Sequence, residues 1–129
     1  ELQGTDVEEP GQAKVTRGYR LPAKYVIHTV GPSVRDGIIA DDDVDILYNC
    51  YWNALELTRQ MPDVSSIAFP AIATGYNAFP IRKAATIALD AVNTWMDKYG
   101  QCLDLIVFSV HSESDALTYA DVINTWIDD

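Results

Sequence analysis

The sequence is poor in basic residues, and this scarcity limits the partners that the protein can have. Only 9 of its 129 residues are Lys or Arg, against 19 Asp and Glu, so the formal net charge at pH 7 is -10. Surfaces that bind nucleic acids need clustered Lys and Arg to displace counterions from phosphates, and here the basic residues are scattered. We therefore expect no nucleic-acid partner.

Long apolar runs are also absent. No stretch approaches the roughly 18 uninterrupted apolar residues that a membrane helix needs. Hydrophobic residues make up 48% of the chain and charged residues 22%, which is typical of soluble globular proteins. A chain of this length buries roughly two-thirds of the surface that it exposes when unfolded. We expect residues 1–129 to form one domain, without a membrane partner.

Cysteine and histidine are rare, with two residues of each kind. Cys50 and Cys102 lie in apolar, helix- or strand-like contexts, which predicts two buried, reduced thiols and a cytoplasmic location. Together with His28 and His111 they form no zinc pattern, and we expect no metal and no cofactor. The chain has no signal peptide and no initiator Met, so we expect it to be a fragment of a longer product.

The first half of the sequence is predicted to form two strands and a helix. Strand-like runs cover residues 12–21 and 24–30, and we expect them to pair as a hairpin. Apolar residues at helical spacing predict a helix over residues 44–61, which a proline ends. We expect residues 33–43 to form a loop whose three aspartates, 41–43, complement the positive end of that helix.

Strand and helix alternate in the second half. Nearly all-apolar runs at residues 66–72 and 103–110 are typical of strands buried on both faces. Between them, apolar residues at offsets of three and four predict a long amphipathic helix that ends at Gly100. A last helix is predicted over residues 113–127, with Ser112 at its start. This βαβ pattern predicts an α/β fold, a three-layer α/β/α sandwich.

Two loops of such a fold are candidates for a binding site. Ligands bind at the C-terminal ends of parallel strands, and residues 73–80 and 111–114 must both open there. The first loop, ATGYNAFP, contains Gly75, which adopts backbone angles that other residues resist, and Pro80, which suits the first position of a helix. It matches neither a Walker loop nor the dinucleotide fingerprint. Its amides and the Thr74 hydroxyl could wrap a diphosphate without any cationic side chain. The alternative is a plain surface loop that caps the helix.

Other residues suggest different chemistries. His28 lies in the middle of a strand, where a structural hydrogen-bonding role competes with a catalytic one. Ser109 and His111 share one face of a strand and would form a nucleophilic pair if a third group oriented the histidine. The aspartates 41–43 favour a solvated helix start over a metal site.

Two separate motifs carry a family likeness. The stretches PGQAKVTRGYRLPAKYVIHTVGP (10–32) and SIAFPAIATGYNAFPIRKAATIAL (66–89) resemble, in order and spacing, macrodomains of the MacroD-like type. This is a family of ADP-ribose-binding, Appr-1''-p-processing modules. The resemblance continues through the final strand and helix and covers nearly the whole chain. It implies a mixed sheet between helices, with ADP-ribose along the C-terminal rim.

The resemblance also implies the site residues. The diphosphate-binding loop of the family, whose backbone amides hold the two phosphates, falls on Ala73, Thr74, Gly75, Tyr76, Asn77, Ala78 and Phe79. The strand end beside the adenine and its ribose falls on Val110, His111 and Ser112. Tyr76, Asn77 and Ala78 depart from the usual pattern. Asn77 removes an aromatic ring that stacks on the ribose, and Ala78 adds a methyl where backbone and phosphate come close.

The first strands and the Gly-rich loop of the family have no counterpart here, because the chain contains no run of glycines. They supply the adenine-contacting aspartate and the hydrolytic residues, so no catalytic residue is named. Hydrolysis of ADP-ribosyl or O-acetyl-ADP-ribose esters is expected once that part is supplied. The alternative is a degenerate macro-like scaffold for protein association without a ligand. One absent strand lies in mid-sheet in the family, which predicts unpaired edges. They would be satisfied by a homo-oligomer, by a complementing N-terminal fragment or by a fold that closes its own gap.

Overall fold

A computed structural model of the chain describes residues 9–18, 23–34, 38–72, 79–110 and 112–128. The strands are β1 (Ala13–Arg17), β2 (Tyr25–Thr29), β3 (Ser66–Phe69) and β4 (Leu105–Phe108). The helices are α1 (Asp41–Thr58), α2 (Ile81–Tyr99) and α3 (Glu113–Asp128), and a 3-10 turn (Gly100–Cys102) follows α2. The predicted α/β class, with strands and helices in alternation, is confirmed.

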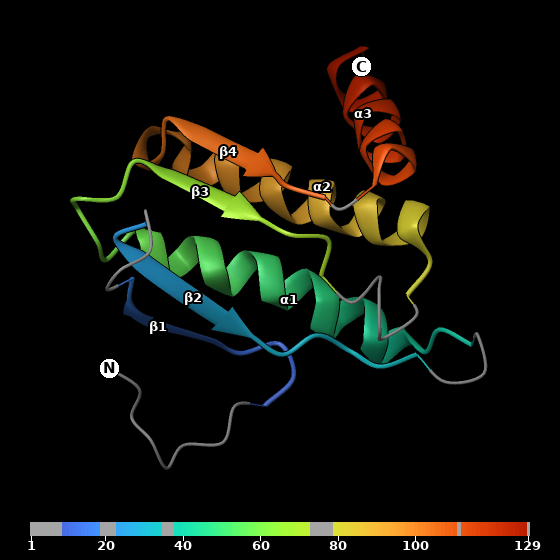
Figure 1. The fold of residues 1–129 in the computed structure, drawn as a ribbon, viewed down its shortest axis with the longest axis horizontal. Coiled ribbons are helices and arrows are strands. Elements are labelled where there is room, and N and C mark those ends of the chain that lie inside the picture. Colours follow the sequence, from blue (N-terminus) through green and yellow to red (C-terminus); the bar gives the residue numbers. More distant parts are fainter. Residues whose placement is uncertain (1–8, 19–22, 35–37, 73–78, 111, 129) are drawn as a thin grey trace.

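The strands form two pairs of different sense. β1 and β2 are antiparallel, with Ala13 opposite Thr29, whereas β3 and β4 are parallel, with Phe69 opposite Phe108. The arrows of β2, β3 and β4 point the same way in Figure 1, and β2 and β3 face one another. The predicted hairpin and the predicted βαβ unit are therefore both present.

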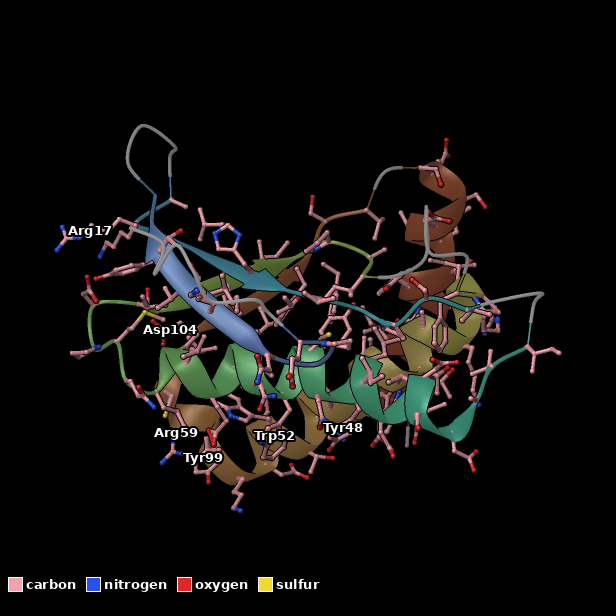
Figure 2. All side chains as sticks on the ribbon, turned by 90° about the horizontal axis from the view of Figure 1, so that it is seen from below. Arg17, Tyr48, Trp52, Arg59, Tyr99 and Asp104 are labelled. Carbon is pink, nitrogen blue, oxygen red and sulfur yellow. The ribbon has the colours of Figure 1, made fainter. Side chains whose placement is uncertain are left out.

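Helices α1 and α2 pack side by side against one face of the strands (Figures 1 and 2). The buried stripe of α2 is rich in alanine, and such small side chains let two helices approach closely. Trp95 of α2 is fully buried, and its indole Nε1 donates to Glu56 Oε2 at 3.3 Å. On the outer side, the Arg59 guanidinium lies 3.8 Å from the centre of the Tyr99 ring (Figure 2). These contacts join α1 to α2 at one end of the helix pair.

Helix α1 begins earlier and the strands end sooner than the sequence predicts. Asp41–43 form the first turn of α1 instead of a loop, and the Ala40 N–H donates to Asp43 Oδ2 at 2.9 Å. Carboxylates in a first turn are stabilised by the positive end of the helix. Strand β3 stops at Phe69, directly before Pro70, whose ring fixes its own φ angle.

The prediction that two strands are buried on both faces is wrong for the described residues. Ala68 is exposed, and the side chains of Leu105 and Val107 on the same face are 55% and 40% exposed. The helices α1 and α2 cover only the opposite face, so the apolar character of these strands exceeds their burial. Leu117 of α3 is likewise exposed.

The remaining local predictions, on the cysteines and on His28, have different outcomes. Cys50 and Cys102 are both free thiols, but only Cys50 is buried, since Cys102 lies in the 3-10 turn outside the core. His28 has the structural role, with its Nε2 at 3.0 Å from Thr16 Oγ1. No helix within the described ranges has the length and hydropathy to cross a bilayer.

Candidate functional site

The C-terminal ends of β3 and β4 meet at one rim of the molecule (Figure 1). Phe69 and Phe108 are register partners, and the Ser109 N–H donates to the Phe69 carbonyl oxygen at 2.7 Å, so the two strands end level. From this rim one segment leaves toward α2 and another toward α3. The two strands that lead into the predicted loops therefore end at the same rim, and the opening of both loops there stays a prediction, because residues 73–78 and 111 lie outside the described residues.

Most of the predicted diphosphate loop lies outside the described residues. This applies to six positions of the loop and to one at the strand end: Ala73, Thr74, Gly75, Tyr76, Asn77, Ala78 and His111. The described members are Phe79, Val110 and Ser112. Their ligand contacts stay predictions, but the structure shows what their side chains do.

Phe79 anchors the end of the loop. Its side chain is 1% exposed and belongs to the hydrophobic core, so it faces the protein interior and leaves only its backbone for a ligand. Pro80 follows as the residue before the first turn of α2, and its carbonyl accepts the Ala84 N–H at 2.9 Å. The helix start is therefore fixed directly after the loop.

The second loop also ends in a helix start. Val110 is half-buried and packs against the core. Ser112 is exposed, and its Oγ accepts the Asp115 N–H at 3.0 Å while its carbonyl accepts the Ala116 N–H at 3.0 Å. The Ser112 hydroxyl thus caps α3, as the sequence predicts, and this use competes with a direct contact to a ligand.

A buried tyrosine of α1 holds the approach to the first loop. The Tyr51 hydroxyl donates to the Pro70 carbonyl and accepts the Ile72 N–H, both at 3.4 Å. Its ring centre lies 4.9 Å from that of Phe69. Burial raises the pKa of Tyr51 well above its ordinary value, so it remains a neutral donor. The apolar spacing that predicts a helix over residues 44–61 gave no sign of this role of Tyr51.

A second tyrosine lies beside the same rim. Tyr119 of α3 is buried, and its ring centre is 5.4 Å from that of Phe108. Burial raises the pKa of Tyr119. Its hydroxyl has no hydrogen-bond partner in the part of the chain that the structure describes. The Tyr119 and Tyr51 hydroxyls nevertheless lie close enough for each to influence the pKa of the other.

The electrostatics at the start of α2 favour an anion. The first turn carries no acidic residue, in contrast to α1 and α3, and contains the exposed Arg82 and Lys83. Arg82 pairs with Asp121 of α3. Helix N-termini attract anions through their free N–H groups and the helix dipole. This end of an otherwise acidic molecule is thus suited to negative charge. Sequence reasoning predicted an anion at this helix start but overlooked the two basic residues of its first turn.

Within the described ranges, no group of three or more His, Cys, Asp or Glu side chains is arranged to hold a metal ion. The suggested Ser109–His111 pair includes a residue outside those ranges. The described part of the rim therefore offers backbone groups, a helix start and tyrosine hydroxyls as its polar chemistry.

Comparison with known families and proteins gives a consistent result. A family model described as Macro domain matches residues 1–88. Human ADP-ribose glycohydrolase MACROD2 is 44% identical over 123 residues, which are 95% of this chain and 28% of that protein. A protein-ADP-ribose hydrolase of Staphylococcus aureus is 41% identical over 117 residues, 91% of this chain and 43% of that protein. The chain thus spans less than half the length of these two relatives.

Solved structures show the same fold. The Oceanobacillus iheyensis macrodomain with ADP has a TM-score of 0.85 and 35% identity, covering 93% of this chain and 60% of that one. The Trypanosoma brucei macrodomain in complex with ADP-ribose has a TM-score of 0.79 and 33% identity, covering 89% of this chain and 46% of that one.

Proposed function

Since this chain belongs to the macrodomain family, we propose that it binds ADP-ribose or a derivative of it through backbone amides of residues 73–79. The observation that supports the proposal best is the level end of β3 and β4, the two strands that lead into the predicted loops. Related macrodomains of known structure were solved with ADP and with ADP-ribose.

The local charge fits a diphosphate. Backbone amides at the start of a helix bind phosphate oxygens without any cationic side chain. Here Lys83 in the first turn of α2 adds positive potential, while Phe79 fixes the end of the loop in the core. In this proposal Val110, His111 and Ser112 lie beside the adenine and its ribose, and no cofactor takes part.

We further propose that hydrolysis of ADP-ribosyl or O-acetyl-ADP-ribose esters needs residues beyond the 129 of this chain. Two relatives are named as hydrolases of ADP-ribose linkages, and the chain matches less than half of each. The reaction would use a water molecule held between the substrate and the diphosphate instead of a protein nucleophile. None of the 129 residues is proposed to be catalytic.

Calorimetric titration with ADP-ribose tests the binding proposal. We expect binding in the micromolar range for the chain, and loss of binding in Gly75→Val, because a β-branched side chain restricts the loop. Gly100→Val at the other end of α2 is the matched control. Gly100 has helical angles, and a Cβ there would be 3.7 Å from the nearest atom, Met96 Cε, so affinity should be unchanged.

A scaffold without a ligand is the second candidate, and the sequence at Asn77 and Ala78 favours it. These residues replace an aromatic ring and a small glycine of the family's loop, as noted above. If neither heat nor a thermal shift is seen with millimolar ADP-ribose, the scaffold is supported and the binding proposal fails. An ADP-ribosylated protein serves as the separate substrate for an assay of hydrolysis.

A further inference from the structure

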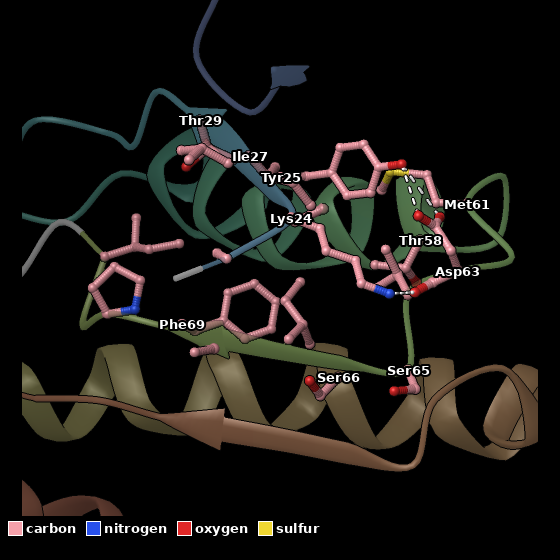
Figure 3. Close-up of a pocket in the computed structure, with 18 residues that line it drawn as sticks. Lys24, Tyr25, Ile27, Thr29, Thr58, Met61, Asp63, Ser65, Ser66 and Phe69 are labelled. Carbon is pink, nitrogen blue, oxygen red and sulfur yellow. Dashed lines mark hydrogen bonds between the residues drawn. The ribbon is translucent and has the colours of Figure 1, made fainter. Parts of the chain in front are cut away.

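Residues 70–72 lead the chain from β3 into the predicted diphosphate loop. Phe69, Pro70 and Ile72 line a cavity of about 690 Å³ between β2 and β3 (Figure 3), so this side of the segment has no close packing. From α1, the Tyr51 hydroxyl donates to the Pro70 carbonyl and accepts the Ile72 N–H. The position of the segment therefore depends on how firmly Tyr51 is held.

An aromatic cluster connects Tyr51 to α3. The ring centre of Phe108, at the end of β4, lies 6.2 Å from that of Tyr51 and 5.4 Å from that of Tyr119. The Phe69 ring centre lies 4.9 Å from that of Tyr51 and 5.9 Å from that of Phe108. Both tyrosines and Phe69 are buried. The cluster thus joins α1, the ends of both parallel strands and α3 inside the core.

The two tyrosine hydroxyls of this cluster have complementary capacities for hydrogen bonds. A hydroxyl has one proton to donate and two lone pairs that accept. Tyr51 gives its proton to Pro70 and uses one lone pair for Ile72, so one lone pair is left. Within the described ranges, the buried Tyr119 hydroxyl has no acceptor for its proton. Burial raises the pKa of both tyrosines, and each hydroxyl also affects the pKa of the other, so the two oxygens are neighbours and both keep their protons at neutral pH.

We propose that Tyr119 is a positioning residue for the ADP-ribose site, because its hydroxyl donates to the remaining lone pair of Tyr51. A buried donor without a partner is costly, so a small shift of either ring that closes this bond is favourable. The bond fixes the Tyr51 oxygen and, through it, the Pro70 carbonyl and the Ile72 N–H. Tyr119 therefore acts on the diphosphate loop through Tyr51, without touching the ligand. The inference rests on the proposed function for the identity of that ligand.

The same bond links the two predicted ligand loops. Tyr119 lies in the second turn of α3, and α3 starts directly after Val110 and Ser112, which are predicted to lie beside the adenine and its ribose. A ligand that holds the start of α3 thus also holds Tyr51 and the approach to the other loop. ADP-ribose gains from this arrangement because it is predicted to contact both loops. Hydrogen bonds behind a site are a general means of fixing its geometry.

Calorimetric titration of ADP-ribose into Tyr119→Phe tests the positioning role. This variant keeps the buried ring and loses only the hydroxyl, and we expect its affinity to be about three- to tenfold weaker than that of the parent chain. Tyr99→Phe is the matched control, since it makes the same chemical change at the last residue of α2, away from the rim. Its affinity should stay within about twofold of the parent.

A double-mutant cycle shows whether Tyr119 acts through Tyr51. Tyr51→Phe removes the acceptor, so adding Tyr119→Phe to it should weaken ADP-ribose binding by less than about a further twofold. A merely structural role of Tyr119 would lower the affinity by the same factor with and without the Tyr51 hydroxyl.

Amide hydrogen exchange measured by NMR tests the link without a ligand. In Tyr119→Phe, exchange should accelerate at Ile72, whose N–H donates to Tyr51, and stay unchanged at Ser109, whose N–H donates to Phe69. This separates the two possible failures. If the parent chain does not bind ADP-ribose, the proposed function fails, and the exchange data still decide whether Tyr119 positions residues 70–72.

Three results would overturn the proposal. The first is a Tyr119→Phe chain that binds ADP-ribose as tightly as a parent chain that binds it. The second is unchanged exchange at Ile72. The third is a higher urea midpoint for Tyr119→Phe than for the parent, because the loss of a buried hydroxyl stabilises a protein only where that hydroxyl is unpaired.

Discussion

Replacement of Phe79 by alanine tests whether the end of the candidate loop is anchored in the core. Phe79 is 1% exposed and packs in the cluster built from α1, α2 and β3. Truncation of a buried phenylalanine costs about 3–5 kcal/mol, through lost transfer energy and the cavity that remains. Domains of this size have about 5–15 kcal/mol in total. We therefore expect Phe79→Ala to lose a large part of the free energy of unfolding, measured by urea denaturation at 25 °C.

The ligand arm of this experiment separates anchoring from general destabilisation. Leu103→Ala is the matched control, because Leu103 is 4% exposed and lies before β4, at the end of the strands away from the rim. Its truncation costs about 2–5 kcal/mol. Each loop residue that Phe79→Ala releases must be ordered again when the ligand binds. Ordering one residue costs about 1–2 kcal/mol of binding free energy, which weakens the affinity roughly tenfold. We expect weaker ADP-ribose binding in folded Phe79→Ala and unchanged binding in Leu103→Ala. A stability loss under about 1 kcal/mol, or equal affinities in both variants, would refute the reasoning.

Two further predictions concern α1. Tyr51→Phe keeps the ring but removes the hydroxyl that bridges Pro70 and Ile72, and should lower the free energy of unfolding by about 1–2 kcal/mol in urea; no change would show that the bridge contributes nothing. Burial raises the pKa of the Cys50 thiol above its ordinary value of 9.0, so the unfolded chain releases this proton at lower pH than the folded chain. This contribution to stability is complete below the unfolded pKa and is lost as pH rises through the folded pKa. Cys50→Ala should therefore flatten the alkaline fall of the urea midpoint above about pH 9, and an equally steep fall in the variant would contradict the assignment.

The helices were the most predictable part of the fold. For α2 the periodic apolar stripe and the flanking Pro80 and Gly100 agree, and the observed helix lies between these two residues. The start of α1 was less predictable, because Asp41 is compatible with both a loop and a first turn. The bond from the Ala40 N–H to Asp43, together with the bonds that the Ala40 carbonyl accepts from the N–H groups of Asp43 and Val44, shows the first turn.

Contacts between distant segments were not predictable from sequence. The role of Tyr51 depends on how α1 packs against β3, and no local sequence pattern predicts that packing. The apolar runs of β3 and β4 predict that both faces of these strands are buried, but helices α1 and α2 cover only one face. The mismatch leaves apolar surface exposed at Leu105 and Val107.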